Sequence, residues 1–205
     1  MFKYFWFCNK VYIIGWFLLF VDTFSLWKNN SLSRRDKSNK GNIDKQIKPL
    51  IDKINKLDNY FTTSSCSGRI CILIEPKSGL KKDFNSLYKS HDITKFSDLK
   101  KALNNIPKEK LWFRFDSMIL HVACKNLDDT NLFLEKARGL FKHSGIISTK
   151  EKFIIEIRDS GFIETVIAVN GKLIVDYNYL KILLNEANNK LRIVHKKINL
   201  LKNMI

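Results

Sequence analysis

One short segment of the chain combines most of the side-chain types that ligand-binding chemistry uses. Residues 62–69 read TTSSCSGR and place hydroxyl groups, a thiol, a glycine and an arginine between two apolar stretches. Hydroxyls and exposed backbone amides can surround an anion, and the guanidinium of Arg69 can bind a carboxylate or phosphate through two hydrogen bonds. Gly68 would permit a sharp turn or the close approach of a ligand. A serine-rich turn that caps a strand explains the same residues, so both interpretations stay open.

The histidines are the next candidates, because imidazole accepts and donates protons near neutral pH. His91 follows Ser90 at the end of an expected strand, where it is either a proton acceptor or a surface residue. His121 lies in the apolar run MILHVAC, where a lone histidine is more often part of the core. His195 stands among lysines on the last expected helix, and we expect it to be exposed. No base can be assigned to activate Cys66, so a nucleophilic thiol has little support.

Two polar positions in the second half of the chain follow expected elements. Residues 143–145 (HSG) form a turn after a helix, and this turn either contacts a ligand or simply ends the helix. Arg158 ends an apolar strand, where an arginine is either an edge residue or a clamp for an anionic ligand.

Motifs of the common nucleotide-binding and hydrolytic enzymes are absent from the sequence. Neither GxGxxG, GxxxxGK[ST], GxSxG nor HExxH occurs, so no Rossmann cofactor domain or P-loop is predicted. The four cysteines, Cys8, Cys66, Cys71 and Cys124, form no CxxC pair. We therefore expect reduced thiols, with neither a zinc site nor a disulfide framework.

Hydrophobic periodicity predicts alternating strands and helices. Helices are expected over residues 43–57, 96–103, 128–141 and 177–201, with Pro49 either starting or kinking the first. Strands are expected over residues 60–63, 70–74, 87–91, 153–158 and 162–169, with a turn over 64–69, and residues 111–124 form two strands or one bent strand. The pair Asn170-Gly171 between apolar runs predicts a hairpin. The expected fold class is α/β (α+β), a mixed β-sheet flanked by helices.

Length and composition favour one folded domain that carries a large positive charge. The 205 residues include 45% hydrophobic side chains, which is enough for a core and excludes a wholly disordered chain. The net charge of +16 favours a polyanionic partner such as nucleic acid, although a codon bias toward lysine would produce the same surplus. The polar, basic segment over residues 25–41 is either a solvated loop or an arm whose Arg34, Arg35, Lys37 and Lys40 contact phosphates.

The first 23 residues differ from the rest, and we divide the chain into an extension (1–23) and a domain (24–205). Residues 12–21, YIIGWFLLFV, are too few for a comfortable transmembrane helix, which needs about 20 apolar residues. The run has the length of a signal-peptide core, but no small-residue cleavage site follows it. The extension is a targeting segment, a membrane anchor or a wrongly assigned start. We expect a cytoplasmic protein, with organellar or membrane targeting left open.

A series of longer motifs has the order and spacing of one known family. The most specific is YFTTSSCSGRI at 60–70, and the others are DKSNKGNID at 36–44, KPLIDKIN at 48–55, SHD at 90–92, LWFRF and ILHVAC within 111–124, FKHSGI at 141–146, EIRDS at 156–160, and GKLIVDYNYL and NEANNKL nearer the C-terminus. On these residues, from about Leu32 onward, the chain resembles the tRNA wybutosine-synthesising protein 3 family of archaea and eukaryotes. It departs from the family's pattern at Ser86 (usually Trp), Leu140 (usually Gly), Gly161 (commonly His) and Val166 (usually Pro).

This resemblance implies a non-Rossmann methyltransferase with S-adenosyl-L-methionine as methyl donor. Its substrate would be N(4) of the 7-aminocarboxypropyl-demethylwyosine base beside the anticodon of tRNA(Phe). Methyl transfer from a sulfonium is a one-step displacement, so positioning supplies much of the acceleration. The alternatives are a non-catalytic RNA-binding module of the same fold and a membrane-tethered interaction protein. No obligate protein partner is indicated.

With this activity, the candidate residues receive roles. His91, and after it His121, would accept a proton or orient the base. Arg69 or Arg158 would hold the carboxylate of the modified side chain, and the basic arm would contact tRNA phosphates. The residues expected to bind the cofactor are Ser64, Ser65, Cys66, Ser67, Gly68, Ser144 and Gly145.

Overall fold

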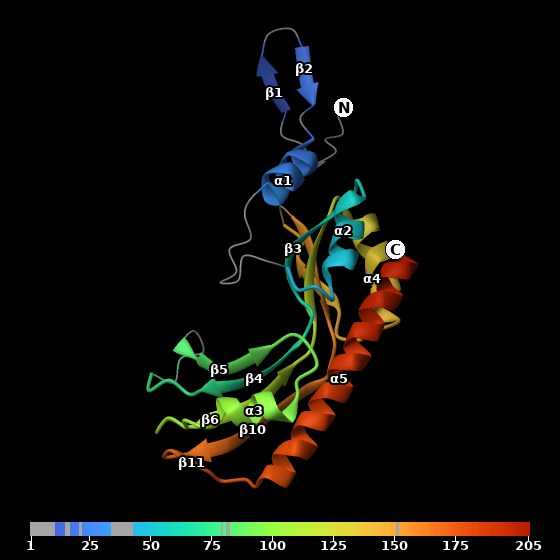
Figure 1. Ribbon diagram of the computed structural model, residues 1–205. Helices are drawn as coiled ribbons and strands as arrows, with labels where there is room; N and C mark the ends of the chain where they lie inside the picture. The colour runs from blue at the N-terminus through green and yellow to red at the C-terminus, as the bar shows by residue number, and fades with distance from the viewer. Residues whose placement is uncertain are drawn as a thin grey trace.

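The computed structural model describes residues 11–14, 17–20, 22–33, 43–78, 80, 83–150 and 152–205 (Figure 1). These residues form two larger antiparallel sheets, a separate two-stranded hairpin and five helices. The five-stranded sheet has the order β11–β10–β6–β4–β5, with β4 at Arg69–Ile74, β5 at Asn85–Ser90, β6 at Leu111–Asp116, β10 at Phe162–Val169 and β11 at Lys172–Leu173. The four-stranded sheet has the order β3–β7–β9–β8, with β3 at Tyr60–Cys66, β7 at Ile119–Cys124, β8 at Gly145–Ser148 and β9 at Phe153–Arg158.

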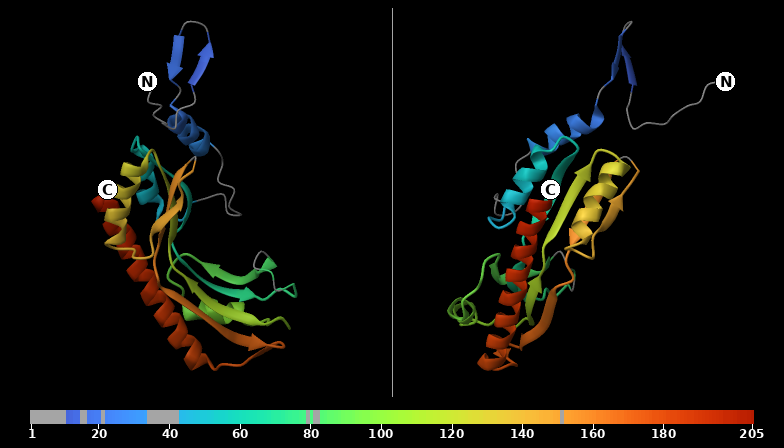
Figure 2. Two further views of the ribbon diagram at one scale, coloured as in Figure 1. Left: turned by 180° about the vertical axis from the view of Figure 1, so that it is seen from behind. Right: turned by 90° about the vertical axis from the view of Figure 1, so that its right-hand side faces the viewer.

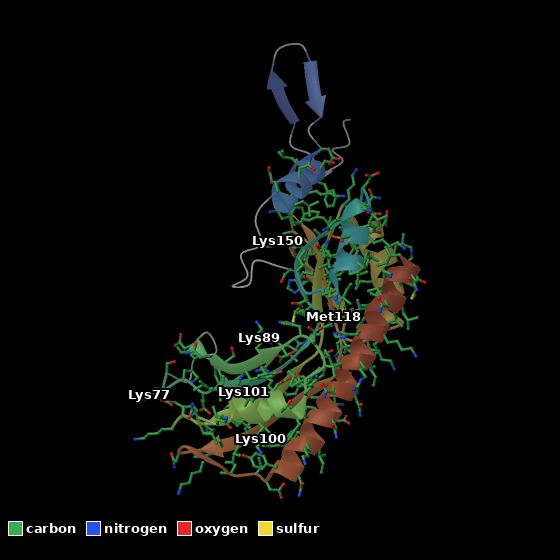
Figure 3. All side chains as sticks on the ribbon, in the orientation of Figure 1. Lys77, Lys89, Lys100, Lys101, Met118 and Lys150 are labelled. Carbon is green, nitrogen blue, oxygen red and sulfur yellow. The ribbon has the colours of Figure 1, made fainter. Side chains whose placement is uncertain are left out.

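Three pairs of consecutive strands pass from one sheet into the other at the same level. The pairs β3–β4, β6–β7 and β9–β10 are each joined by only two or three residues, and we call this junction the crossover. Ser67 and Gly68 make the first connection, and the buried Met118 lies in the second, between the two sheets in Figure 3. Because the connections are this short, each of these strands continues almost directly into the other sheet. The two sheets meet at an angle, as Figures 1 and 2 show.

Helices cover one face of each sheet. Helices α2 (Lys48–Lys56) and α4 (Leu127–Arg138) pack on the four-stranded sheet, and α3 (Phe96–Ala102) lies by β5. Helix α5 (Tyr177–Met204) runs along both sheets and contacts α2, α4 and β4 (Figure 2). Its 28 residues span about 42 Å at 1.5 Å per residue. As its periodicity predicted, it buries Leu180, Leu184, Ala187, Leu191, Val194, Ile198 and Leu201.

The opposite face of each sheet is not covered by α2–α5, and we call it the open face. Along β6, Leu111, Phe113 and Phe115 are fully buried in the core, whereas the alternating Trp112, Arg114 and Asp116 are partly exposed. This alternation is the signature of an antiparallel sheet with one solvated face.

Helix α1 (Thr23–Leu32) covers part of the open face of the four-stranded sheet. Its Phe24 and Trp27 rings pack against Phe61 of β3, with ring centroids 5.5 and 4.6 Å away, and Ala123 completes this small cluster. Before it, β1 (Val11–Ile14) pairs with β2 (Phe17–Phe20) as an antiparallel hairpin. Among the residues that the structure describes, no helix is both long and apolar enough to span a membrane. The division of the chain at residue 23 stays a prediction.

The α+β class and the non-Rossmann architecture are confirmed, and the details differ in three places. All pairings between described strands are antiparallel, so the expected mixed sheet is two antiparallel sheets. Strand β3 continues through the serines to Cys66, because the segment predicted to turn pairs with β7 instead. Strand β8 was not predicted, and neither was helix α1, whose residues from 25 onward were expected to belong to a loop or arm. The hairpin at Asn170-Gly171 is confirmed, with positive φ at both residues.

The backbone and packing at Gly68, in the crossover, disfavour any residue with a side chain. Its φ is +95°, and a Cβ there would lie 3.1 Å from Leu191 Cδ1 of α5 and 3.3 Å from the Asp116 carbonyl oxygen. We expect Gly68→Ala to lower the free energy of unfolding by about 2 kcal/mol, since strain and overpacking combine. Gly139→Ala is the matched control, because Gly139 has helical φ and a free Cβ position. Urea unfolding followed by circular dichroism measures both, and equal stabilities would contradict this account.

Candidate active site

Two parts of the serine-rich segment lie in different environments. Ser64 is exposed on β3, and Ser65 and Cys66 are partly exposed. Ser67 is fully buried, and both its N–H and its hydroxyl donate to Asp44 Oδ2, at 2.9 and 3.1 Å. Of the serines expected to bind a cofactor, Ser67 is therefore committed to holding the backbone.

Asp44 and His91 meet at this segment from distant parts of the sequence. His91 Nδ1 lies 3.1 Å from Asp44 Oδ2, 2.9 Å from the Gly68 carbonyl oxygen and 3.8 Å from Cys66 Sγ. Asp44 was expected only as part of the first helix, over residues 43–57. In the structure α2 starts at Lys48 with Ile47 as N-cap, and Asp44 is a central acceptor of the site.

The pKa values of this pair are displaced in opposite directions. The hydrogen bond with Asp44, followed by the contact with Cys66, raises the pKa of His91 to about 9, although burial opposes the shift. Burial would raise the pKa of Asp44, but hydrogen bonds from His91 and Ser67 lower it overall. At neutral pH the site therefore holds an imidazolium–carboxylate pair, and His91 is a donor rather than a proton acceptor.

The same three side chains could also be considered as metal ligands. A carboxylate oxygen of Asp44, Cys66 Sγ and a ring nitrogen of His91 all lie within 4.8 Å of one another. However, the Asp44 oxygen already accepts hydrogen bonds from Ser67, and His91 Nδ1 is within hydrogen-bond distance of Gly68 O. The geometry is fully explained as a hydrogen-bonded charge pair.

Helix α5 supports these residues from the core side. Asn188 is buried, accepts from the Thr94 N–H at 3.0 Å and donates to the Thr94 carbonyl at 2.9 Å, which fixes the loop after His91. His195, two turns further along, was predicted to be exposed, and this is wrong. Its ring is partly buried, its Nε2 has no hydrogen-bond partner in the described structure, and burial lowers its pKa.

Arg69 projects on the open face of the five-stranded sheet, beside the crossover. Its Nε donates to Asp116 Oδ2 at 2.8 Å, and Arg114 Nε donates to the other carboxylate oxygen at 2.6 Å. Arg114 also reaches Glu164 at 3.4 Å. Since Arg69 uses only Nε in these bonds, the outer edge of its guanidinium is available to a ligand.

A second charged group lies on the open face of the four-stranded sheet. The register aligns Ser64, His121, Glu156 and Gly145 in one row across all four strands. His121 Nε2 lies 3.1 Å from Glu156 Oε2, so His121 is a partly exposed, paired residue and the core interpretation is wrong.

Arg158 lies in the next row of this sheet, with Cys66 and Ile119. It is exposed and forms no ion pair with any residue that the structure describes. Its guanidinium is therefore available to bind an anion. The interpretation of Arg158 as a clamp for an anionic ligand requires this.

The remaining predicted residues divide into two groups. The Ser144 hydroxyl donates to the Phe141 carbonyl at 2.7 Å, so Ser144 stabilises a turn, while Gly145 begins β8 in the row of His121. Arg34, Arg35, Lys37 and Lys40 lie outside the described residues.

The cysteines and a pocket at the other end of the five-stranded sheet are further candidate groups. Cys66, Cys71 and Cys124 are free thiols, as predicted, and burial raises the pKa of Cys71 to about 11 and that of Cys124 to about 12. A pocket of about 430 Å³ lies away from the histidines, at the far end of the five-stranded sheet, lined by Glu75, Pro76, Lys77, Lys108, Glu109 and Lys110.

Fold and site together define an α+β enzyme that places cations and carboxylates around an exposed junction, without a glycine-rich nucleotide loop. Two solved structures share the fold. A Pyrococcus horikoshii protein is 34% identical with a TM-score of 0.83, covering 89% of this chain and 96% of that one. A hypothetical protein from Aeropyrum pernix is 28% identical with a TM-score of 0.67, covering 78% and 96%.

Sequence comparison identifies the family. The model described as "Methyltransferase TYW3" matches residues 25–205, so the chain belongs to this family of methyltransferases. The Xenopus laevis "tRNA wybutosine-synthesizing protein 3 homolog" is 34% identical over 83% of this chain and 69% of its own length. The Pyrococcus furiosus "tRNA(Phe) 7-((3-amino-3-carboxypropyl)-4-demethylwyosine(37)-N(4))-methyltransferase 1" is 38% identical over 81% and 86%. The resemblance inferred from the motifs is confirmed.

The His91–Asp44 pair makes stability depend on pH in a defined window. Because folding raises the pKa of His91 from 6.5 to about 9, the stabilisation is complete below pH 6.5 and is lost as pH rises to about 9. The difference in free energy of unfolding between the wild type and His91→Gln should therefore shrink across this range.

Asp44→Asn provides the control for this prediction. Removing the carboxylate charge should return the pKa of His91 toward its ordinary value, which titration of the histidine ring protons by NMR measures directly. A stability difference that stays constant from pH 6.5 to 9, or an unchanged His91 titration in Asp44→Asn, would contradict the assigned pair.

Proposed function

We propose that this protein transfers a methyl group from S-adenosylmethionine to N(4) of 7-(3-amino-3-carboxypropyl)-4-demethylwyosine in tRNA(Phe). Relatives from Pyrococcus, Thermococcus and Methanocaldococcus at 38–40% identity bear the name of this activity. The observation that carries the proposal is the convergence of Asp44, Cys66, His91 and Arg69 beside the crossover. The large positive charge of the chain suits a tRNA substrate.

The charged groups of the open faces suit both the donor and the acceptor. S-adenosylmethionine supplies an electrophilic methyl group on a sulfonium that also carries a 3-amino-3-carboxypropyl chain. The proposed acceptor base carries a 3-amino-3-carboxypropyl chain of its own. The site must therefore hold two zwitterions, each of which needs a cation for its carboxylate and a carboxylate for its ammonium.

The structure offers two such pairs of charges, one on each sheet. Arg69 and Asp116 lie together on the five-stranded sheet. Arg158 and Glu156 are two residues apart on β9, which puts both on the open face of the four-stranded sheet. We assign one pair to the donor and the other to the acceptor. The exposed Ser64 lies in the row of Glu156, and Ser64 and the partly exposed Ser65 remain candidates for contact with the donor.

The histidines take different roles in this proposal. His91 is protonated at neutral pH, so it orients the base by donating a hydrogen bond. Methylation displaces the proton of N(4), and His121, which Glu156 orients, receives it. Both residues thus keep the catalytic assignment made from the sequence, with the two expected roles divided between them.

Mass spectrometry of tRNA nucleosides tests the proposed reaction directly. We expect tRNA(Phe) that carries the demethylated intermediate to gain one methyl group only when this protein and S-adenosylmethionine are both present. Product formation with His91→Gln should fall by at least about tenfold, because an orienting group is lost. An intermediate that stays unmethylated with the wild-type protein would refute the substrate assignment.

Arginine variants test how the two zwitterions are divided. Arg69→Ala should abolish activity while leaving the fold intact, and Arg158→Ala should reduce it strongly. Calorimetry with S-adenosylmethionine should show that one variant loses donor binding, while the other keeps it and has a raised KM for tRNA.

Arg192→Ala on α5 is the matched control, since Arg192 is exposed and donates a hydrogen bond to Asn189 on the same helix. If Arg69→Ala retains wild-type turnover, that residue does not belong to the site. A wild-type protein that binds tRNA but gives no heat with S-adenosylmethionine would instead be a non-catalytic RNA-binding module.

A further inference from the structure

The open face of the five-stranded sheet continues well beyond the residues assigned to methyl transfer. The register of β5, β4, β6 and β10 places its side chains in three rows. From the crossover outward these rows are Arg69–Asp116–Phe162, then Lys89–Cys71–Arg114–Glu164, and then Ser86–Leu73–Trp112–Val166. Each row therefore carries an aromatic ring or a cation: Arg69 and Phe162 in the first, Lys89 and Arg114 in the second, and Trp112 in the third.

Both aromatic residues on this face are held in place by charged neighbours. Phe162 is 50% exposed, which is unusual for so large an apolar side chain, and Arg114 lies 5.5 Å from its ring centroid. Trp112 Nε1 donates to Glu75 Oε2 at 2.7 Å, and Lys110 Nζ lies 5.7 Å from its ring centroid. The rings thus present fixed apolar surfaces at a charged, solvated face.

Cations border the two rings along the whole sheet. Lys89 lies on the side of β5 that faces the four-stranded sheet, and Lys77 projects from the far end of β4 (Figure 3). At that end Lys77, Lys108 and Lys110 line the pocket of about 430 Å³. A ligand that extends from the crossover to this pocket would meet cations at both ends of the sheet and in the second row, with Trp112 in the row between.

We propose that the open face of the five-stranded sheet binds the single-stranded RNA that flanks the target nucleoside, with bases stacked on Phe162 and Trp112. This inference rests on the proposed function for the identity of the RNA. Lys89, Arg114 and Lys110 contact the phosphates. Alternating aromatic surfaces and cations on a sheet are the features that single-stranded nucleic acid requires, because each nucleotide offers a planar base and a charge.

The spacing of the rings agrees with this occupant. Asp116, which pairs with Phe162, is four residues from Trp112 on β6, or about 13 Å at 3.3 Å per residue. A stacked strand rises about 3.4 Å per nucleotide, so the rings would contact bases a few nucleotides apart. The Phe162 row contains Arg69, which places its base next to the one that is methylated.

Binding of unmodified tRNA(Phe) and of its isolated anticodon stem-loop, measured by fluorescence anisotropy, tests this surface without requiring turnover. Phe162→Ala should weaken binding of both RNAs about tenfold, as expected for one lost stacking contact, with affinity for S-adenosylmethionine unchanged. Lys89→Ala should also weaken binding. It alone should reduce the slope of log K against log salt by about one, because one phosphate contact disappears.

Two variants on α5 and α3 are the matched controls. Tyr179→Ala removes an aromatic ring that is 42% exposed, and Lys101→Ala removes an exposed lysine. Both should bind RNA as the wild type does, and circular dichroism should show all four variants folded.

Several outcomes would overturn the proposal. The first is an RNA affinity of Phe162→Ala and Lys89→Ala within twofold of the wild type. The second is a loss of RNA affinity in the two control variants as large as that in Phe162→Ala and Lys89→Ala. The third is binding of a poly-glutamate peptide as tight as binding of the RNA. Failure of the proposed methylation is seen separately, as absence of product with a wild-type protein that binds RNA normally.

Discussion

Contacts of α5 hold the turn between β3 and β4 and the loop after His91 in one fixed arrangement. Gly68 approaches Leu191 so closely that a Cβ would lie 3.1 Å from it, and three residues earlier Asn188 fixes Thr94 through two buried hydrogen bonds. The first contact sets the turn between β3 and β4, and the second sets the loop that follows His91. The distance between His91 and the serine segment therefore depends on one rigid helix rather than on the two loops themselves.

This support explains why the site can keep an ion pair at an exposed junction. His91 and Asp44 come from segments without regular structure, and their side chains stay only 14–15% exposed because the surrounding backbone is fixed. An isolated surface pair would contribute little, whereas this pair is partly buried and shares hydrogen bonds with Ser67 and Gly68. The open faces on either side then carry further charges that point toward solvent. Helix α1 covers the end of the open face of the four-stranded sheet that is away from the crossover. There Trp27 packs on Phe61, and Lys152 Nζ lies 4.7 Å from the Trp27 ring centroid.

Much of this architecture follows from local sequence, and the site follows only in part. The apolar stripe of the last helix identified α5 correctly, because packing enforces its period. Residues 111–124 were expected to form two strands or one bent strand, and they form the two strands β6 and β7. The serines of β3 were expected to form a turn because serine favours turns locally. They form a strand instead, because pairing with β7 overrides that preference. The short β8 has no alternation to detect, as its two central isoleucines are both exposed.

Asp44, Asn188 and His195 were missed as site residues for a common reason. Their importance comes from partners 23 to 128 residues away, and no periodicity records such contacts. His121 looked like a core residue because its neighbours in MILHVAC are apolar, yet the strand directs it to the open face, where Glu156 pairs with it. The motif TTSSCSGR lies at the candidate site, but its letters could not show that Ser67 is turned inward while Ser64 is exposed.

The clamp between Thr94 and Asn188 also has a consequence for how the protein matures. It joins positions 94 residues apart, and Gly68 meets Leu191 across a still longer stretch of chain. Synthesis proceeds from the N-terminus, so both sheets can begin to pair before α5 has left the ribosome. Until that last helix docks, the loop of His91 lacks the two hydrogen bonds from Asn188, and the glycine turn lacks its packing against Leu191. The final arrangement of the site is therefore completed by the part of the chain that is synthesised last.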